Sequence, residues 1–498
     1  MSEIKDLNFE YLRKYLNVPQ FISALLYVVF LGKIGEALYG LANAFKFKNK
    51  NVHQCNLEEE LLNFKEIYDT IFSLLRRHHE WMQSSINLIA SENVASPAVK
   101  EAIVTDFGDR YAEGWPGERV YAGTIYIDEV EMIAMDLAKK LFKAEFADVR
   151  PISGVVANLV IYTAFTKPGD RMMALSIPTG GHISSAKSKL WGTAGKVHGL
   201  KVQYFPYNEE ELNIDVDETI KKVRRLEKRG KHVTLFQFGG SVFPFPHPVK
   251  ELRSLADEFG SFINYDAAHV AGLIGCDKFQ DPLREGADSM SLSTHKTLPG
   301  PQHGLVLSWN KYAEYIKKAS FPGMLSNHHL HNVAGLAVVL AEMLEYGKAY
   351  TTQIIKNAKA LSQSLHERGF KVLGESKGFT ESHTILVDIT RHGDGMLIEQ
   401  LLERASIIIN RNLLPWDVRE GRDYKRPGGI RLGTSEVTHI GMRESEMDAI
   451  AEFIKRVVID KESPDKIKED IKEFRQDFQK VHYCFDDSTD AYKYIKIR

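Results

Sequence analysis

A lysine at the end of an apolar run, Lys296 in SMSLSTHK, lies in surroundings that suggest chemistry. The flanking Thr294, His295 and Thr297 are polar, and the Gly-Pro run PGPQHG follows at once. A lysine crowded against a cationic or desolvated site has a lowered pKa, so its amine becomes a nucleophile that can form an imine. A lone lysine in a loop is more often a surface charge, so Lys296 needs chemical partners to be read as functional.

An acidic residue, Asp266, directly follows the apolar run SFINY and is followed by the small residues Ala267 and Ala268. A carboxylate at the end of a buried strand can pair with a protonated nitrogen of a ligand. Asp is also a favoured helix N-cap, and the two roles are compatible. His269 comes about one helical turn later and would face the same pocket.

Two glycine-containing loops could hold an anion and a flat ring. Ser153 and Gly154 in RPISGVVAN precede an apolar helix, and backbone N–H groups with a hydroxyl at a helix N-terminus form an anion site. The pair is also common turn chemistry. His182 follows two glycines in TGGHIS, so its imidazole could stack on a ligand ring. An ordinary loop histidine with satisfied hydrogen bonds is an equally good interpretation.

Further charged residues could handle a substrate. Arg431 in PGGIRLGT lies between glycines on a short β-like run, and a bidentate arginine is a natural clamp for an α-carboxylate. Glu113 lies with Tyr111 in the Gly- and aromatic-rich loop RYAEGWPGERVYAG, where it could act as a general acid or base. A surface arginine and a solvated loop glutamate are the alternatives.

Together these residue types meet the needs of a pyridoxal 5'-phosphate site. Such a site requires a lysine for the imine, a carboxylate for the pyridine nitrogen and donors for the phosphate. It also requires a flat group over the ring and a cation for the substrate carboxylate. Each requirement has a candidate at the end of a predicted strand or in a loop.

The elements that must position these residues alternate between strands and helices. The strands are predicted at Val233–Phe238, Ser261–Tyr265, Ser289–Ser293 and Gly304–Trp309. VKELRSLADEFG, between the first two, predicts an amphipathic helix that Gly260 ends as a C-cap. This alternation predicts a three-layer α/β domain with a mainly parallel sheet, whose ligands bind beyond the carboxyl ends of the strands.

The sequence predicts three segments. Residues 1–56 form an N-terminal extension, with an apolar helix and a polar, Lys-rich linker. Residues 57–345 form a helical arm and the large cofactor-binding domain. Residues 346–498 form a smaller C-terminal α/β domain, which includes the strand-like runs HTILVDI and SIIINRN. We expect the charged and aromatic tail, Ser463 to Arg498, to lie on the surface or on a partner.

Composition narrows the class of protein. The chain of 498 residues has a formal net charge of -2, so it offers no field of one sign to attract nucleic acid. Three widely spaced cysteines predict neither a disulfide framework nor a zinc site, and favour a reducing, cytoplasmic compartment. The apolar run Phe21–Leu31 is shorter than the ~20 residues that span a bilayer, so it favours packing over membrane association.

The order of the motifs resembles that of a known family. NLIASENVASP, RYAEGWPGERVYAG, IDEVE, SGVVAN, GGHIS, YDAAHVAGLI, STHKTLPGP and GGIRLGT resemble motifs of serine hydroxymethyltransferases and stand in the same order. The resemblance covers about Asn87 to Asp460. GGSVFPFPHPVKEL, FPGMLSNHHLHN, NRNLLPWD and FRQDFQKVHYCFD resemble the archaeal-type branch. In the common bacterial branch, QGG stands where this chain has Leu325, Ser326 and Asn327.

The resemblance implies a fold-type I pyridoxal-phosphate enzyme that interconverts serine and glycine. It implies a homodimer or tetramer with shared active sites, and a tetrahydrofolate or tetrahydromethanopterin that accepts the one-carbon unit. The resemblance implies that the cofactor is bound by Lys296, Asp266, His182, Ser153, Gly154, Ser241, His269 and Thr294. It implies substrate contacts by Arg431 and Ser91, and a contact with the pterin by Asn412. The implied catalytic residues are Lys296, His295 and, from the neighbouring subunit, Glu113, Tyr111 and Tyr121.

The sequence departs from the family pattern at four positions, and it allows two other functions. Val155, Val120, Thr179 and Ser185 replace residues usual in the family, which affects expected cofactor and pterin binding more than the reaction class. One alternative function is a pterin-independent aldolase or transaldolase acting on threonine-like substrates. The other is a non-catalytic relative retained for subunit or membrane association, against which Lys296, Asp266 and Arg431 argue.

Overall fold

The computed structural model describes residues 64–487 and 490–492. The chain divides into two units, Met1–Tyr68 and Asp69–Arg498, and the second holds nearly all of the described residues. The predicted extension 1–56, with its apolar run at 21–31, lies outside the described residues. Within the described ranges, no helix is long and apolar enough to cross a membrane.

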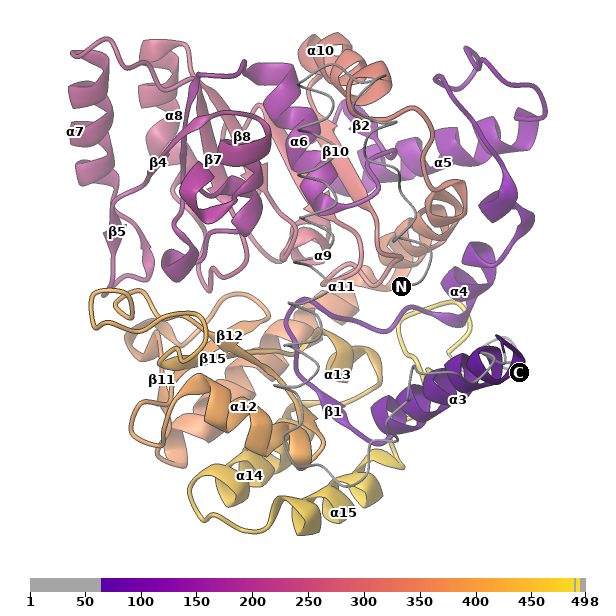
Figure 1. The fold of residues 1–498 in the computed structure, drawn as a ribbon, viewed down its shortest axis with the longest axis vertical. Coiled ribbons are helices and arrows are strands. Elements are labelled where there is room, and N and C mark those ends of the chain that lie inside the picture. The colour runs from indigo at the N-terminus through magenta and orange to yellow at the C-terminus, as the bar shows by residue number, and fades with distance from the viewer. Residues whose placement is uncertain (1–63, 488–489, 493–498) are drawn as a thin grey trace, which may run out of the picture. The chain divides into compact units, whose positions relative to one another are not determined.

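A seven-stranded sheet forms the centre of the larger unit (Figure 1). Its strand order is β2-β10-β9-β8-β7-β3-β4, in which β4, β3, β7, β8 and β9 run parallel and β10 runs antiparallel to both of its neighbours. The strands are β2 (Phe146–Asp148), β3 (Arg171–Ala174), β4 (Lys201–Tyr204), β7 (Leu235–Gly239), β8 (Phe262–Asp266), β9 (Ser289–Ser293) and β10 (Gly304–Ser308). The predicted α/β class and its mainly parallel sheet are confirmed, and all four predicted strands form.

Helices cover this sheet and complete the three layers. They are α5 (Ile125–Phe142), α6 (Gly154–Phe165), α7 (Val216–Glu227), α8 (Val249–Phe259), α9 (Ala271–Gly275), α10 (Ala313–Lys318) and α11 (Leu330–Glu367). Helix α6 packs on β9 and β10, whereas α8 packs on β8. As predicted, α8 ends at Gly260, whose φ of 69° lies in the left-handed region that glycine adopts without strain.

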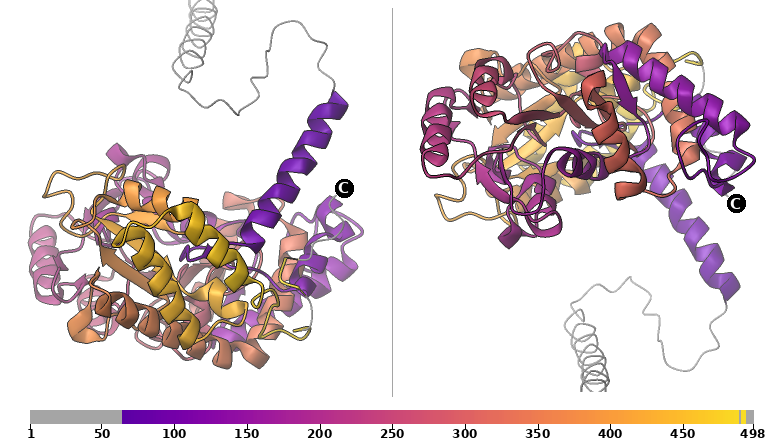
Figure 2. Two further views of the ribbon diagram at one scale, coloured as in Figure 1. Left: turned by 90° about the horizontal axis from the view of Figure 1, so that it is seen from below. Right: turned by 90° about the horizontal axis from the view of Figure 1, so that it is seen from above.

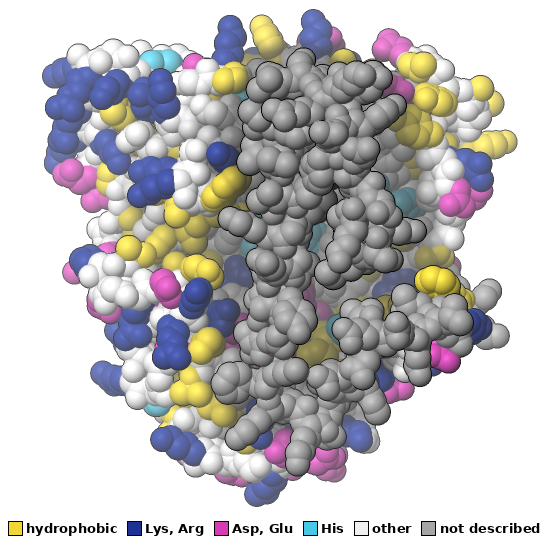
Figure 3. All heavy atoms as spheres, in the orientation of Figure 1, with side chains coloured by type: hydrophobic (Ala, Val, Ile, Leu, Met, Phe, Trp, Pro, Cys, Tyr) yellow, Lys and Arg dark blue, Asp and Glu magenta, His cyan; other side chains and the backbone are white. Residues whose placement is uncertain are grey.

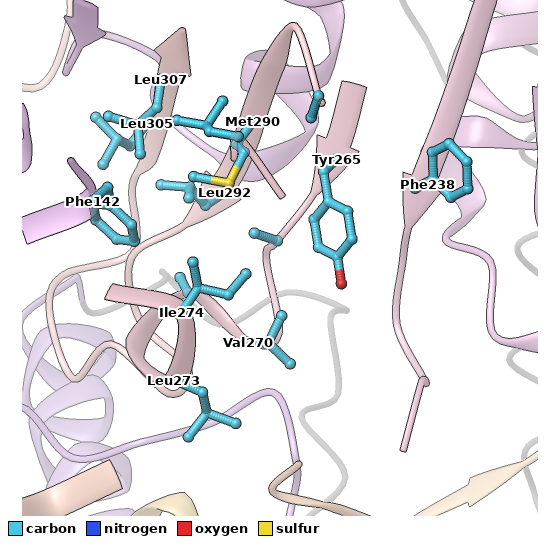
Figure 4. Close-up of a cluster of buried hydrophobic side chains, with 14 of the residues drawn as sticks. Phe142, Phe238, Tyr265, Val270, Leu273, Ile274, Met290, Leu292, Leu305 and Leu307 are labelled. Carbon is cyan, nitrogen blue, oxygen red and sulfur yellow. The ribbon is translucent and has the colours of Figure 1, made fainter. Parts of the chain in front are cut away.

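The main core lies between the sheet and these helices, where Met290 and Leu292 of β9 meet Leu305 and Leu307 of β10 (Figure 4). All four side chains are fully buried, and burial of each contributes roughly 1.5–3 kcal/mol. Alternate residues of β9 are serines, so one face of this strand is apolar and the other presents hydroxyls. The hydroxyl face lies toward α6.

A four-stranded antiparallel sheet forms a second layered region after the large sheet. Its order is β11-β12-β15-β14, with β11 (Lys371–Val372), β12 (Thr384–Asp388), β14 (Asn410–Asn412) and β15 (Gly429–Gly433). Its helices are α12 (Gly395–Arg404), α13 (Ser435–His439), α14 (Glu444–Val458) and α15 (Pro464–Arg475). The predicted boundary between the large and small domains, at 345/346, lies inside the unbroken helix α11. The boundary therefore stays a prediction.

The beginning of the described chain joins this second region. Strand β1 (Ile86–Asn87) pairs in parallel with β13 (Ile407–Ile408), and α4 (Pro97–Ile103) follows it. The remaining short strands, β5 (Tyr207–Asn208) and β6 (Asn213–Ile214), form a separate antiparallel pair. The segment between β1 and α4 carries Ser91, so strand pairing places this predicted substrate residue next to the small sheet.

Most described residues of the C-terminal tail are exposed or half-buried, as expected, but one side of the tail is buried against the small sheet. Ile467 and Ile471 of α15 are fully buried in the core of the small sheet. Arg475 is also fully buried, and its Nε donates to the carbonyl oxygen of Ser85 at 2.6 Å. The tail's polar composition concealed an amphipathic helix whose apolar side closes this core.

The surface has two features that the composition does not reveal. Helix α3 (Phe64–Gln83) has no buried residue, and from Asp69 onward it projects from the rest of its unit (Figure 2). Lys and Arg side chains gather over α7 (Figure 3), where Lys221, Arg224 and Arg225 are exposed. The near-neutral net charge therefore coexists with a local basic face.

Candidate active site

Lys296 lies three residues beyond the end of β9 and is only 8% exposed. Burial lowers its pKa to about 8, with Arg431 lowering it further and Asp266 opposing the shift. The neutral amine is therefore much more populated near neutral pH than in a solvated lysine. Lys296 is thus suited to nucleophilic chemistry, as its sequence context predicts.

Asp266 is the last residue of β8 and is 4% exposed. Its Oδ1 accepts the backbone N–H of Ala268 at 3.1 Å, and its Oδ2 accepts Nδ2 of Asn158 at 2.8 Å. The first bond closes a turn before α9, whose N-cap is Val270, so Asp266 is not the helix N-cap that its sequence also allowed. Each carboxylate oxygen can accept a further bond, so Asp266 can also receive a proton-bearing nitrogen of a ligand.

His182 caps the short helix η3 (Ile183–Ser185). Its Nδ1 accepts the backbone N–H of Ser184 at 3.2 Å, and the hydroxyl oxygen of Ser184 lies 2.8 Å from the same nitrogen. Burial lowers the pKa of His182, and the charges of Lys296 and Arg431 lower it further. The ring is therefore neutral at physiological pH, with its proton on Nε2.

Two close backbone approaches hold the loop of His182 against the loop that follows β7. The N–H of Ser241 donates to the carbonyl oxygen of Gly180 at 2.7 Å. A Cβ added at Gly180 would lie 1.9 Å from the carbonyl oxygen of Val242, and Gly180 has a φ of 98°. Only glycine therefore fits at this position, which explains the first of the two glycines before His182.

An anion cradle lies at the N-terminus of α6. Ser153 is its N-cap, and its Oγ accepts the N–H of Val156 at 3.2 Å. A Cβ added at Gly154 would lie 2.4 Å from Oγ of Ser293, so the helix start packs closely against the end of β9. The first N–H groups of a helix lack intrahelical partners, so this end can accept a phosphate, and Val155 still offers its N–H.

Arg431 of β15 reaches from the small sheet to the loop after β7. Its Nη1 donates to the carbonyl oxygen of Ser241 at 3.0 Å, and its Nε donates to Oδ1 of Asn410 at 3.1 Å. Burial lowers its pKa to about 10. Within the part of the chain that the structure describes, no carboxylate forms an ion pair with Arg431. A buried cation without a counter-ion is costly, so the site favours an anionic ligand here.

A family model described as serine hydroxymethyltransferase matches residues 64–454. The chain belongs to the serine hydroxymethyltransferase family. Proteins named serine hydroxymethyltransferase from Nitrosopumilus maritimus and Methanocaldococcus jannaschii are 58% and 53% identical to it. Each match covers 87% of this chain, and 99% and 100% of the respective relative. A third, from Korarchaeum cryptofilum, is 54% identical over 86% of this chain and 99% of its own.

Membership of the serine hydroxymethyltransferase family confirms the resemblance and its archaeal-type branch. The family has the fold-type I architecture, so the fold class is confirmed as well. It also implies pyridoxal phosphate and a pterin co-substrate. Pyridoxal phosphate with an amino acid requires a buried lysine, a carboxylate, a helix N-terminus and a cation. Lys296, Asp266 at the end of β8, the start of α6 and Arg431, which has no ion pair among the described residues, supply these groups, so the residues present fit the cofactor.

Several predicted serine hydroxymethyltransferase residues lie beside this set. His269 stacks on His383 with ring centroids 5.6 Å apart. Burial first, and then the charge of Lys296, lowers the pKa of His269 well below its usual value. Thr294 donates to the carbonyl oxygen of Pro301 at 2.6 Å. His295 and Ser91 line a neighbouring cavity of about 570 Å³ that Lys296 does not line. Among the residues that the structure describes, the Nδ1 of His295 has no hydrogen-bond partner.

Among the described residues, no contact links Glu113 or the two tyrosines, Tyr111 and Tyr121, to the site of their own chain. The rings of Tyr111 and Tyr121 lie 4.8 Å apart and are partly exposed. The hydroxyl of Tyr111 instead lies 3.2 Å from Oγ of Ser326, and Asn327 accepts the N–H of Ala112 at 3.0 Å. This loop therefore presents its tyrosines outward.

Asn412 lies at the end of β14, two residues beyond the Asn410 that contacts Arg431. Its Nδ2 donates to the carbonyl oxygen of Leu413 at 2.7 Å. Because side chains alternate along a strand, Asn410 and Asn412 share a face. Asn412 is therefore on the side of the small sheet that carries the arginine.

Sequence reasoning missed four residues that support the site: Asn158, Ser184, His383 and Asn410. Asn158 had a detectable signal, because it lies one helical turn after Gly154 inside the quoted motif SGVVAN. His383 gave none, since a histidine at the start of a strand is ordinary. Its Nε2 lies 3.0 Å from the carbonyl oxygen of Ala90, next to Ser91.

Proposed function

We propose that this protein interconverts serine and glycine and transfers the one-carbon unit between serine and a tetrahydropterin. The observation that carries the proposal is the convergence of buried Lys296, Asp266 and Arg431 and half-buried His182 in a member of the serine hydroxymethyltransferase family. When bound, pyridoxal phosphate supplies an electron sink for the electrons of a bond broken at the substrate Cα. The protein must hold that group and orient the substrate.

Lys296 would hold the cofactor covalently, because its amine is buried and easily deprotonated. Asp266 would keep the pyridine nitrogen protonated through a charge-assisted hydrogen bond. His182 would cover one face of the ring with its neutral imidazole. Asp266 ends β8, whereas Lys296 and His182 lie in the loops after β9 and β3, so all three are at the carboxyl end of the parallel strands, where ligands of such sheets bind.

The phosphate would lie at the N-terminus of α6, with Ser153 and Gly154 as donors. Ser241, Thr294 and His269 would complete the cofactor contacts. Arg431 and Ser91 would bind the substrate carboxylate, which supplies the counter-ion that the arginine lacks among its described neighbours. A fixed carboxylate orients the Cα substituents, and that orientation selects the bond to be broken.

Glu113, Tyr111 and Tyr121 would act in the site of a neighbouring subunit, so we propose a homodimer or a tetramer with shared active sites. The outward presentation of the two tyrosines supports this arrangement. Glu113 would move the proton at the substrate β-hydroxyl or on the pterin. His295, beside Lys296, would assist through its neutral ring, since burial lowers its pKa to about 4.

The pterin would contact Asn412, and either tetrahydrofolate or tetrahydromethanopterin fits the proposal. Two departures from the family pattern already have partners of their own. The hydroxyl of Thr179 lies 2.9 Å from that of Ser176, and Ser185 lies 3.0 Å from the hydroxyl of Tyr162. Val120 is 72% exposed, so it leaves a surface that the pterin could contact. Comparing the rates with the two pterins decides between them.

We also propose that the protein works in the cytoplasm. Cys276 and Cys484 are buried free thiols, which suits a reducing compartment. Localisation of the tagged full-length chain, with residues 1–56 present, tests this directly. Recovery of the full-length chain with membranes would overturn the proposal.

The test of the function is a spectral titration of the purified protein. We expect bound pyridoxal phosphate to absorb in the visible, and glycine to produce a strong long-wavelength band only when a tetrahydropterin is added. K296A should lose the lysine-linked absorption, whereas K348A, at an exposed position of α11, should keep it. A long-wavelength band that ignores the pterin would indicate the aldolase activity instead. No cofactor binding after reconstitution would indicate a non-catalytic relative.

A further inference from the structure

A single buried amide, that of Asn158, joins the two side chains that would contact the cofactor ring. Its Nδ2 donates one proton to Oδ2 of Asp266 at 2.8 Å and the other to Oγ of Ser184 at 3.0 Å. Ser184 in turn contacts Nδ1 of His182. Asn158 is 1% exposed, so no water competes for these bonds. Both amide protons are therefore used.

The oxygen of the same amide is held from the other side. Oγ of Ser291 donates to Oδ1 of Asn158 at 2.6 Å, and Nε2 of Gln237 lies 3.3 Å from the same oxygen. A flipped amide would turn its N–H groups toward the Gln237 donor and its oxygen toward the Asp266 carboxylate. Both contacts would be repulsive, so the orientation of Asn158 is unique.

A second buried amide closes the network beneath the first. Nδ2 of Asn264 donates to Oγ of Ser291 at 2.9 Å and to Oε1 of Gln237 at 3.0 Å. Because Ser291 accepts that bond, its own hydroxyl proton is available for Asn158. Oδ1 of Asn264 accepts from Ser289 at 2.7 Å. These side chains come from the neighbouring strands β7, β8 and β9, which makes the support rigid.

We propose that Asn158 is a positioning residue, which holds the Asp266 carboxylate aimed into the site and, through the hydroxyl of Ser184, helps to hold the imidazole of His182. Because Asn158 donates to Ser184, the hydroxyl proton of Ser184 is free to point at Nδ1 of His182. The backbone N–H of Ser184 donates to the same nitrogen at 3.2 Å, so the imidazole carries its proton on Nε2 and the hydroxyl adds a second donor to Nδ1. One amide thus supports both side chains that would contact the cofactor ring, Asp266 directly and His182 through Ser184.

This inference rests on the proposed function, since it assigns Asn158 to the support of cofactor-contacting residues. The decisive variant is N158D, which keeps the shape but replaces the donor to Asp266 with an oxygen. Two carboxylates at hydrogen-bond distance cannot both ionise freely, so they would share a proton and Asp266 would lose charge. The introduced oxygen would also accept the hydroxyl proton of Ser184, so that only the backbone N–H of Ser184 would still donate to Nδ1 of His182.

The first measurement is the dissociation constant for pyridoxal phosphate, obtained by equilibrium dialysis of the dimeric or tetrameric protein. We expect N158D to weaken cofactor binding about 10- to 100-fold, the value of one charge-assisted hydrogen bond. S184A removes only the hydroxyl that contacts Nδ1 of His182. It should therefore keep most of the affinity for pyridoxal phosphate but change the pH dependence of the bound cofactor's absorbance.

The matched control is N357D in α11, which places a carboxylate at another fully buried asparagine whose Nδ2 donates to Thr438 and Met442. It should lower stability without changing cofactor affinity in the folded fraction. Equal affinity in N158D and the wild type would overturn the inference. So would an equal loss in N158D and N357D.

The outcome is separable from that of the proposed function. If the wild type binds no pyridoxal phosphate, the proposed function fails before any variant is compared. If the wild type binds it and N158D binds equally well, only the role of Asn158 fails. If N158D does not fold, N158A removes the amide without adding charge and is judged by the same affinity comparison.

Discussion

Nη1 of Arg431 donates to the main-chain carbonyl oxygen of Ser241 at 3.0 Å, across 190 positions of sequence. The arginine belongs to the small antiparallel sheet, and the serine follows a central strand of the large sheet. This bond joins the two layered regions at the place where the substrate carboxylate would bind. Opening of one region relative to the other would therefore move the carboxylate clamp.

We expect R431K to lower kcat/KM for serine by about 100-fold, because a lysine cannot replace the bidentate contact of a guanidinium, which is worth ~3 kcal/mol. The loss should fall mainly on KM for serine, while cofactor binding changes little. The control is R411K on the neighbouring strand β14, where Arg411 pairs with Glu399 at 3.1 Å. Initial rates at varied serine concentrations decide, and an unchanged KM in R431K would contradict the proposed clamp.

Cofactor uptake by the apo-protein should accelerate as the pH rises, with a midpoint near the pKa of Lys296, about 8. The reason is that only the neutral amine attacks the aldehyde, and its population grows as the pH passes the pKa. R431A should move the midpoint upward, since Arg431 lowers this pKa. Stopped-flow absorbance across the pH range provides the measurement. A midpoint near the ordinary lysine value of 10.5 would show that Lys296 is solvated.

Glu436 should make the protein less stable as the pH rises toward neutrality. Burial first, and then Glu92, raises its pKa from 4.5 to about 7, so the folded state binds the proton more tightly than the unfolded state. Stability from this group is complete below pH 4.5 and is lost as the pH rises to about 7, which amounts to at most about 3 kcal/mol.

E436Q should remove this dependence, because a glutamine never ionises but still accepts from Tyr492, which now donates at 3.1 Å. Urea unfolding at pH 5 and pH 8 should show that E436Q gains on the wild type only at the higher pH. E473Q, at an exposed position of α15, serves as the control. Equal pH dependence in E436Q and the wild type would rule out ionisation of Glu436 as the cause.

Glu131 should make the protein less stable as the pH falls, which is the opposite of the effect of Glu436. It is 1% exposed and contacts Arg119 and His328, at 2.6 and 3.0 Å. Burial alone would raise its pKa, but His328, Arg150 and Arg119 together lower it to about 2. Stability from this group is therefore complete above pH 4.5 and is lost as the pH falls toward 2.

E131Q should cost ~3–5 kcal/mol at pH 7, because it leaves buried arginine charge uncompensated. It should also loosen the loop of Tyr111 and Tyr121, since Arg119 donates to the carbonyl oxygens of Ala112 and Gly114. Urea unfolding measures the first effect, and limited proteolysis of residues 105–124 measures the second. An E131Q protein as stable as the wild type would refute the role of this ion cluster.

Many residues of the site could be predicted from the sequence, because they lie in short local motifs. Asp266 at the end of an apolar run and Lys296 after SMSLS each follow a buried strand, and parallel strands deliver their carboxyl ends to one edge. Local patterns also predicted the Gly260 cap and the location of Ser153 at the start of a helix. These features depend on neighbours within a few residues, which a sequence displays directly.

Only the tertiary structure decided which distant groups share a charge or a proton. The contact of Arg431 with Ser241, the bonds of Asn158 to Asp266 and Ser184, and the burial of Arg475 each join segments far apart in the chain. The position of Asn158 in its motif gives a signal, but only the tertiary structure shows that its partners are Asp266 and Ser184. Hydrogen bonds and pKa values depend on three-dimensional distance and burial, and local periodicity encodes neither.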